Sequence, residues 1–307
     1  MKITLRQIEV FAAIARLENV SRAAVQLNMS QSAASTALLE LERHFDCPLF
    51  DRIGKSLRLN ASGRGLLPQA EDMLARASEV EGYLAGGRLA PVAVGATLTI
   101  GNYLATLVVV DYLQKNPGSR IELSVCNTQQ VIERLRRFEL DIGLIEGEAS
   151  DSDLLFEPWL DDELVVFCAP THPLATAGML RSTALAGQKW IVREPGSGTR
   201  ALFDRAMHAV GIDADVCLQL EHTEAIKRAV ESGLGIGCLS RLSLREALRR
   251  GSLVEIRTPE LALRRRFQFV RQRQRHVSSA TRKFIEECRR FSGGASDTSE
   301  LSLPFIP

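Results

Sequence analysis

The feature that most constrains how this chain can fold is a run of small polar residues, Asn-Met-Ser-Gln-Ser-Ala-Ala-Ser, at positions 28–35. It forms a tight turn after a short helix predicted over Arg22–Leu27, and it begins another helix that ends near Phe45. The apolar positions of this later helix step by four, three and four residues and form one stripe: Ala34, Leu38, Leu41 and Phe45. Its other side presents small polar groups, which suit a DNA groove better than a protein core.

A first amphipathic helix is predicted over Thr4–Leu17, where Leu5, Ile8 and Phe11 recur at helical spacing. Ser21 is expected to cap the second helix. Two helices joined by a short turn, with small polar groups on the first turns of the second, form a helix-turn-helix motif. A serine-rich surface helix without any partner is an equally good interpretation of these residues alone.

The segment that follows favours the DNA-binding interpretation. Extended pieces at 48–52 and 56–60 surround Ile53-Gly54-Lys55 and predict a β-hairpin wing. The whole chain has a net charge of only +1, but residues 1–64 hold nine Lys or Arg against six Asp or Glu. The residues expected to contact base edges or phosphates are Ser21, Gln31, Ser32, Ser35, Thr36, Arg43, Arg52, Lys55 and Arg58.

This N-terminal region resembles the winged helix-turn-helix of LysR-type transcriptional regulators. The resemblance is carried by five strings of residues: Val20–Ala24, Leu27–Ser35, Leu41-Glu42, Pro48–Arg52 and Leu57–Gly63. Two positions depart from the family's pattern, because many members have proline at the position of Ser32 and a basic residue at that of Thr36. These departures concern the preference for particular bases and not the fold.

Residues 62–84 favour a helix with an apolar heptad seam: Leu66, Ala70, Met73, Ala77, Val80 and Leu84. The seam favours pairing with the same helix of a second chain, and packing on its own domain is the alternative. In the resembled family this helix is the dimerisation element, which implies a homodimer or homotetramer that reads two half-sites. Gly86-Gly87 and Pro91 end the helix and mark a linker.

Beyond Pro91 short apolar strands alternate with helices, which predicts an α/β fold wound on parallel sheets. This part resembles the effector domain of the same family, a periplasmic-binding-protein-like pair of lobes. The implied divisions of the chain are a winged helix-turn-helix at 1–61, a linker helix and hinge at 62–90, an effector-binding domain at 91–292 with lobe I at 91–162 and 265–292 and lobe II at 163–264, and a flexible tail at 293–307.

Polar loops are expected where strands end and helices begin, because free amides and the helix dipole favour anions there. One of them, Gly196-Ser197-Gly198-Thr199, is not a phosphate-binding P-loop, since no Gly-Lys-Ser/Thr follows. The strings 95–101, 141–147 and 193–200 are similar to the subgroup of cysteine-biosynthesis and sulfite-responsive regulators, which implies a small anion as effector. The residues expected to bind it are Thr97, Leu98, Thr99, Asn127, Thr128, Gly147, Ser197, Gly198, Thr199, Arg200 and Glu224.

Two other functions remain as alternatives: a solute-binding protein, and an enzyme that uses the cleft between the lobes. The five histidines are dispersed without metal-ligand spacing and no nucleophile elbow is present, so no catalytic residue, metal or cofactor is expected. The basic run at 264–266 is expected on the solvated side of a strand.

The six cysteines form no C-x-x-C pair and are expected to be reduced. The chain starts without a long apolar segment, so we expect a cytoplasmic protein without a membrane partner. Its expected partners are double-stranded DNA and a small anion, with RNA polymerase as a further candidate.

Overall fold

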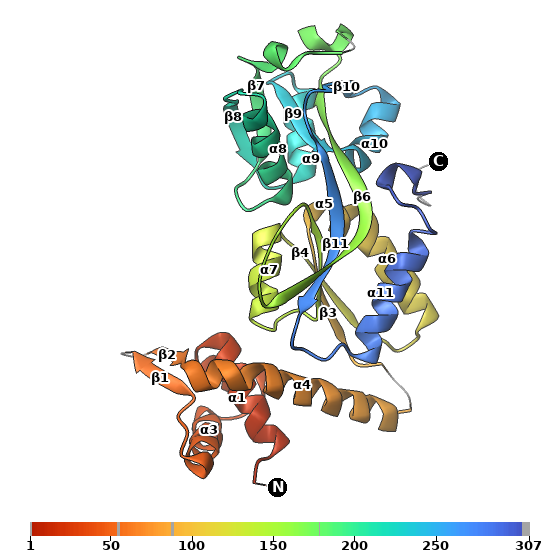
Figure 1. Ribbon diagram of the computed structural model, residues 1–307. Coiled ribbons are helices and arrows are strands. Elements are labelled where there is room, and N and C mark those ends of the chain that lie inside the picture. The colour runs from red at the N-terminus through yellow and green to blue at the C-terminus, as the bar shows by residue number, and fades with distance from the viewer. Residues whose placement is uncertain (1, 54–55, 87–88, 178, 303–307) are drawn as a thin grey trace.

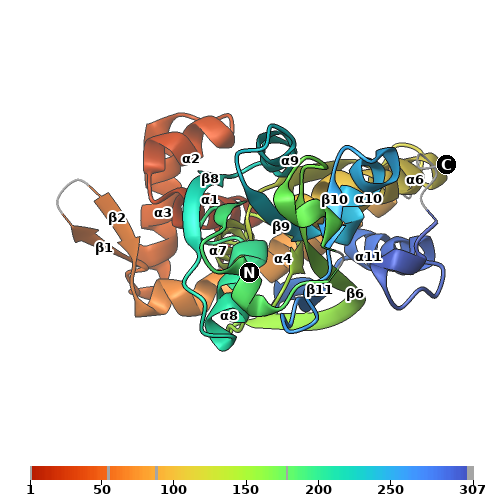
Figure 2. The same cartoon turned by 90° about the horizontal axis from the view of Figure 1, so that it is seen from above.

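The computed structural model describes residues 2–302 apart from 54–55, 87–88 and 178. Figure 1 shows a helical N-terminal module at one end, the long helix α4 running from it, and an α/β region of two stacked lobes beyond. Seen from above, the hairpin β1–β2 projects from one side of the module (Figure 2). Within the described ranges no helix is both long and apolar enough to span a bilayer.

The N-terminal module is built from short helices with well-defined caps and from one hairpin. Its elements are α1 Leu5–Leu17, α2 Val20–Gln26, α3 Gln31–Phe45, β1 Phe50–Ile53 and β2 Ser56–Leu59. Thr4 and Gln7 form a capping box at the start of α1. Asn19 caps α2 by accepting a backbone amide, so the prediction that Ser21 is the cap is wrong: the helix begins earlier than expected. Ser30 caps α3 in the same way.

The long helix α4, Ala61–Leu84, connects the module to the lobes. Asn60 caps it, and its N-terminal half packs on α1. The guanidinium of Arg16 lies 2.8 Å from the buried carboxylate of Glu71, and this ion pair fixes α4 to the module. Helices α1 to α4 therefore share one hydrophobic core.

A nine-stranded mixed sheet runs through both lobes in the order β4-β3-β5-β11-β6-β9-β7-β8, with β10 paired to β6. The strands are β3 Val92–Ala96, β4 Ile121–Val125, β5 Ile142–Glu146, β6 Leu154–Cys168, β7 Lys189–Arg193, β8 Asp215–Leu220, β9 Ile236–Ser240, β10 Val254–Ile256 and β11 Arg264–Gln272. Strands β3, β4 and β5 are parallel, as are β7, β8 and β9. The prediction of parallel sheets fails for β6 and β11, which pair antiparallel with each other and with neighbours in both lobes.

Helices cover both faces of this sheet (Figure 1). They are α5 Leu98–Ile100, the π-helical η1 Gly101–Ala105, α6 Thr106–Lys115, α7 Thr128–Arg136, η2 Pro173–Thr176, η3 Ser182–Leu185, α8 Gly198–Ala209, α9 Thr223–Glu231, α10 Arg241–Arg250, α11 Ser279–Phe291 and η4 Thr298–Glu300. Strands β6 and β11 pass from one lobe into the other and hold the two together.

The prediction of a flexible tail at 293–307 is wrong for its first part. The hydroxyl of Thr298 donates to Asp162 Oδ1 on β6 at 2.8 Å, and Arg245 donates to the carbonyl oxygen of Leu301 at 2.9 Å. The polar composition of this segment suggested fraying, but its polar groups bond partners on the lobes. Residues 303–307 lie outside the described residues.

Candidate functional site

The predicted effector loops meet at a buried boundary between the lobes. In lobe I, Thr97 follows β3 and Gly147 follows β5; in lobe II, Ser197 precedes α8 and Thr223 begins α9. The side chains of Thr97, Ser197 and Thr223 are each at most 2% exposed. This is the arrangement of strand ends and helix starts in which α/β proteins hold ligands.

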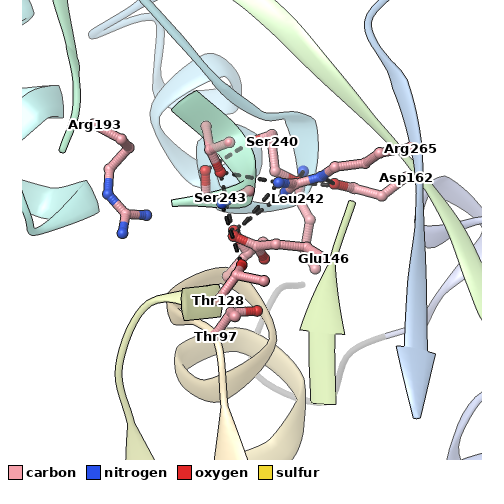
Figure 3. Close-up of polar contacts among 12 residues, drawn as sticks. Thr97, Thr128, Glu146, Asp162, Arg193, Ser240, Leu242, Ser243 and Arg265 are labelled. Atoms are coloured by element: carbon pink, nitrogen blue, oxygen red, sulfur yellow. Dashed lines mark hydrogen bonds and ion pairs between the residues drawn. The ribbon is translucent and has the colours of Figure 1, made fainter. Parts of the chain in front are cut away.

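A buried arginine outside the predicted loops, Arg265 on β11, lies at the centre of this boundary (Figure 3). Its Nε donates to Asp162 Oδ2 at 2.7 Å, and its Nη1 donates to Thr199 Oγ1 at 2.9 Å. Its Nη2 donates to Thr99 Oγ1 at 3.3 Å, and Nη1 also lies 3.4 Å from Glu146 Oε1. One guanidinium therefore bonds to lobe I, to lobe II and to the strand that links them.

Charge holds this cluster together. Burial alone would lower the pKa of Arg265, but the carboxylates of Glu146 and Asp162 raise it above its ordinary value. The hydroxyl of Thr199 accepts from Arg265 and donates to Glu146 Oε1 at 3.2 Å. Buried ions of this kind are stable only while each keeps its partner.

Several buried polar atoms at this boundary have no partner. Among the described residues, the buried side-chain atoms without a hydrogen bond are Glu146 Oε2, Trp190 Nε1, Ser197 Oγ and Thr223 Oγ1. Three of the four belong to the boundary, and buried polar groups are normally paired. Ser197 and Thr223 also stand at the starts of α8 and α9, where the first backbone amides have no partner within the helix. These atoms mark where a polar ligand would bond.

The lobes also touch through hydrogen bonds beside the cluster. The backbone amide of Gly198 donates to Thr128 Oγ1 at 3.2 Å. Asn127 caps α7 and donates from Nδ2 to Glu194 Oε1 at 3.3 Å. The N-terminus of α7 in lobe I therefore faces the N-terminus of α8 in lobe II.

A surface groove of about 880 Å³ opens beside this contact, between α7 and α8. Its wall includes Ser197 and Gly198, so it leads toward the buried boundary. Charged residues of both signs line it: Glu133, Arg136, Arg137, Glu148, Arg200 and Asp204.

A second contact between the lobes joins Tyr103 of η1 to Glu224 and Lys227 of α9. The phenol of Tyr103 donates to Glu224 Oε1 at 2.6 Å, and Lys227 Nζ lies 2.5 Å from the same oxygen. Burial and the hydrogen bond to Glu224 raise the pKa of Tyr103, so the phenol stays protonated as a donor. Burial alone would raise the pKa of Glu224, but the hydrogen bonds from Lys227 and Tyr103 lower it.

This contact should depend on pH. Because the pKa of Glu224 is lower in the folded protein, the contact contributes stability above the ordinary carboxylate pKa of about 4.3 and loses it as pH falls through the folded value. We expect the difference in unfolding free energy between wild type and Tyr103→Phe to be constant above about pH 5 and to narrow below about pH 4. Urea unfolding across this range measures it, and a constant difference at every pH would contradict the assignment.

Two predicted effector residues are already engaged elsewhere. The side chain of Leu98 is apolar and only 7% exposed, so it offers no polar group to an anion. Arg200 was expected to face the anion, but its guanidinium bonds to Asp204 at 2.8 Å and to the carbonyl oxygen of Arg193 at 3.0 Å. The arginine whose guanidinium bonds to both lobes is Arg265.

Three residues of the boundary were not predicted: Glu146, Asp162 and Arg265. The expectation that the basic run is solvated is wrong for Arg265, which is 7% exposed, although Arg264 and Arg266 are exposed. Alternate residues of a strand share a face, so Arg265 lies with Phe267 and Phe269, which are both buried. This period of two is the signal that could have identified it.

The residues predicted to contact DNA lie on α2, α3 and the hairpin, and Figures 1 and 2 show α3 and the hairpin at the same end of the module. Their side chains are exposed except that of Ser35, which is half-buried: Ser21, Gln31, Ser32, Ser35, Thr36, Arg43 and Arg58. The predictions for Lys55 and for the side chain of Arg52 lie outside the described residues. Among the described residues, α3 thus presents a polar face that no other element covers.

The apolar seam predicted on α4 divides into two parts. Ala70 is fully buried and packs within its own module, and Leu66 and Ala77 are half-buried. Met73, Val80 and Leu84 are exposed, the last two to 59% and 77%. An uncovered apolar stripe of this kind is typical of an interaction surface.

Both parts of the chain match known families. Residues 5–64 match the family described as bacterial regulatory helix-turn-helix protein, lysR family, and residues 85–292 match the LysR substrate binding domain. The chain belongs to the LysR family. As a LysR member it is a DNA-binding transcriptional regulator with an effector-binding domain, and not an enzyme.

Individual relatives agree with this assignment. The HTH-type transcriptional regulator YeiE of Escherichia coli K12 is 43% identical over 94% of this LysR chain and 98% of its own length. The regulatory domain of Synechocystis PCC6803 CcmR, solved in complex with 2-PG, is 30% identical and covers 66% of this chain and 98% of its own, with a TM-score of 0.62. Full-length OxyR from Pseudomonas aeruginosa covers 94% of both chains at 22% identity and a TM-score of 0.72, which shows the shared fold.

Proposed function

We propose that this LysR regulator binds operator DNA through α3 and the hairpin, and that a small anion bound between the lobes controls its activity. It acts in the cytoplasm as a homodimer or homotetramer joined through the exposed seam of α4, and RNA polymerase is a further partner. The observation that carries the effector proposal is the set of unpartnered polar atoms buried between the lobes. Relatives support a small ligand, since the CcmR regulatory domain was solved with 2-PG bound.

The same atoms constrain the effector's chemistry. The hydroxyls of Ser197 and Thr223 can each donate to an oxyanion, and helix dipoles at α8 and α9 favour negative charge there. Glu146 Oε2 is an acceptor and needs a donor. The effector we propose is therefore an oxyanion that also carries a proton donor, such as hydrogen sulfite or a hydroxy acid.

Replacing residues of α3 or the hairpin should weaken operator binding without affecting the fold. Gln31 can offer a bidentate amide to adenine, so Gln31→Ala should lower affinity by about ten- to hundredfold and relax specificity. Arg58→Ala should weaken binding to all DNA sequences. It should also reduce the slope of log affinity against log salt concentration by about one, because one phosphate contact is lost. Fluorescence anisotropy on the upstream intergenic DNA across a salt series measures both.

Arg250→Ala is the matched control for Arg58→Ala, because Arg250 is an exposed arginine on α10, at the far end of the molecule from the module. It should bind DNA as wild type does. Unchanged affinity for Gln31→Ala and Arg58→Ala would remove both residues from the DNA interface. If wild type itself binds no DNA, the solute-binding alternative gains support.

A double change in the cleft should abolish the response to effector and preserve DNA binding. Thr97→Ala with Ser197→Ala removes one hydroxyl from each lobe at the buried boundary. We expect the operator affinity of wild type to change more with sulfite or glycolate than with sulfate or acetate, which lack a proton donor. We expect no change in the double variant. Thr171→Ala, on an exposed turn, is the control and should respond normally. A retained response in the double variant would place the effector elsewhere.

A further inference from the structure

Phe138 occupies a backbone conformation that a bulky residue rarely adopts. It follows the C-cap of α7, Arg137, and has a φ of +58°. Glycine is usual at this position, because a Cβ atom is crowded in the left-handed region. The other non-glycine residues with positive φ among the described ones are exposed and polar: Glu18, Asn28 and Asp46. A phenylalanine held at this strained position indicates a role for its side chain.

The side chain of Phe138 packs into the DNA-binding module. It is 7% exposed, although it belongs to lobe I. The hydrophobic cluster that contains it consists otherwise of residues between Ile3 and Leu74, which form α1 to α4 and the hairpin. The guanidinium of Arg275 lies 6.0 Å from the ring centroid and pairs with Asp141 at 2.7 Å, so polar groups cover the ring on its lobe I side.

A second contact aligns α4 with the same lobe. Asp72 Oδ1 accepts the backbone amide of His276 at 2.5 Å, and Glu79 Oε1 accepts that of Ser279 at 2.5 Å. Glu79 Oε2 also lies 3.2 Å from His276 Nε2. Ser279 begins α11, and a carboxylate is favoured at a helix N-terminus. Asp72 and Glu79 are seven residues apart and lie on one face of α4.

The opposite end of α7 lies at the cleft. The backbone amide of Gln129 donates to the carbonyl oxygen of Gly196 at 3.2 Å, and Thr128 Oγ1 accepts the amide of Gly198 at 3.2 Å. Helix α7 therefore contacts lobe II with its first turn and the DNA-binding module through the residue after its last turn. Figure 1 shows it between the helices of lobe II and α4.

We propose that Phe138 docks lobe I onto the chain's own DNA-binding module, and that α7 transmits changes at the cleft to that module. The inference rests on the proposed function, in which an effector alters the contact between the lobes. A helix of nine residues is short and stiff, so a shift of its N-terminus moves Phe138 as well. The strained backbone at Phe138 keeps the ring aimed at the module.

The docking is tested by amide hydrogen exchange of the full chain without DNA or effector. Phe138→Gly removes the ring and relieves the backbone strain, so lobe I itself should keep its protection. We expect amides of α1 and the first half of α4 to exchange at least about tenfold faster, with α7 no faster than in wild type. Leu123→Ala is the control, because Leu123 is half-buried on the core of lobe I, in a cluster that contains no residue of α7 or of the module. It should speed exchange in lobe I and leave the module unchanged.

Transmission is tested by a double-mutant cycle with the same measurement. Thr128→Val removes the acceptor of the Gly198 amide at the cleft end of α7. It should change module exchange by about threefold or more in wild type and have no effect in the Phe138→Gly background. Unchanged module exchange in Phe138→Gly overturns the docking. No effect of Thr128→Val in wild type, or the same effect in both backgrounds, overturns the transmission. Because no DNA or effector is present, failure here is distinct from failure of operator binding.

Discussion

Replacing Arg265 with alanine should destabilise the effector domain by about 3–5 kcal/mol, the largest effect that we expect from a single substitution in this chain. The change leaves the carboxylates of Glu146 and Asp162 buried, each less than 2% exposed, without their shared guanidinium. It also removes the bonds that Thr99 and Thr199 accept from opposite sides of the boundary. Calorimetry of the unfolding of the effector domain measures the loss.

The neighbouring arginine supplies a matched control. Arg266 pairs with Asp161 at 2.8 Å, but both side chains are about half exposed, and a surface pair contributes only about 0–1 kcal/mol. Arg266→Ala should therefore cause little loss. Removing the stranded charges together, with Arg265→Met, Asp162→Asn and Glu146→Gln, should recover much of the stability. A loss below about 1 kcal/mol for Arg265→Ala would show that the cluster is not the ionic network described here.

Gly198→Ala should force the two lobes apart and weaken the response to effector. A Cβ atom on Gly198 would overlap the backbone carbonyl oxygen of Glu146 and lie 3.1 Å from Thr128 Oγ1. The first obstacle is backbone, so a side-chain rotation cannot relieve it, and α8 must move away from β5. We expect a loss of about 1–3 kcal/mol by overpacking, with about 2–4 °C in melting temperature for each kcal/mol. The shift of operator binding with sulfite or glycolate should then be smaller than in wild type.

Gly65→Ala is the control for this change, and we expect it to raise stability instead of lowering it. A Cβ atom on Gly65, within α4, meets nothing within 4 Å. Alanine lowers the entropy of the unfolded chain and favours the helix, so stability should rise by about 0.5–1 kcal/mol. If Gly198→Ala were as well tolerated, the close approach of α8 to β5 would not be a constraint on the cleft.

The sequence predicted well where the signal is local. The turn at 28–30 and the end of α3 at Phe45 follow from side-chain pattern and capping chemistry, which depend on residues a few positions apart. The alternation of short apolar strands with helices beyond Pro91 was also predicted, because each strand is a short apolar run with clear breaks. The loops of the cleft follow from the same local signals.

The errors concern contacts between distant segments. Arg265 lies in a run of arginines, which is typical of the solvated side of a strand. The pairing of β11 with β6 brings it beside Asp162. The hydrogen bond from Thr298 to Asp162 on β6 likewise joins residues far apart in sequence. Because the local composition of 293–302 is polar and gives no sign of this contact, a flexible tail was predicted. The packing of Phe138 on the DNA-binding module could not be predicted from the residues around it, because a phenylalanine after a helix is usually an ordinary core residue. Its strain appears only in the backbone angle φ.

The pairing of β6 with β11 has a mechanical consequence. Their register shifts between Phe267 and Gln268, where Leu160 and Pro158 are the partners and Trp159 is the extra residue. A bulge of this kind bends a strand and increases its twist. Because one continuous sheet joins the lobes, any change in the angle between them must twist these two strands against each other. If the proposed effector changes that angle, the two strands resist the added twist, so we expect the lobes to return to their original angle once the ligand leaves.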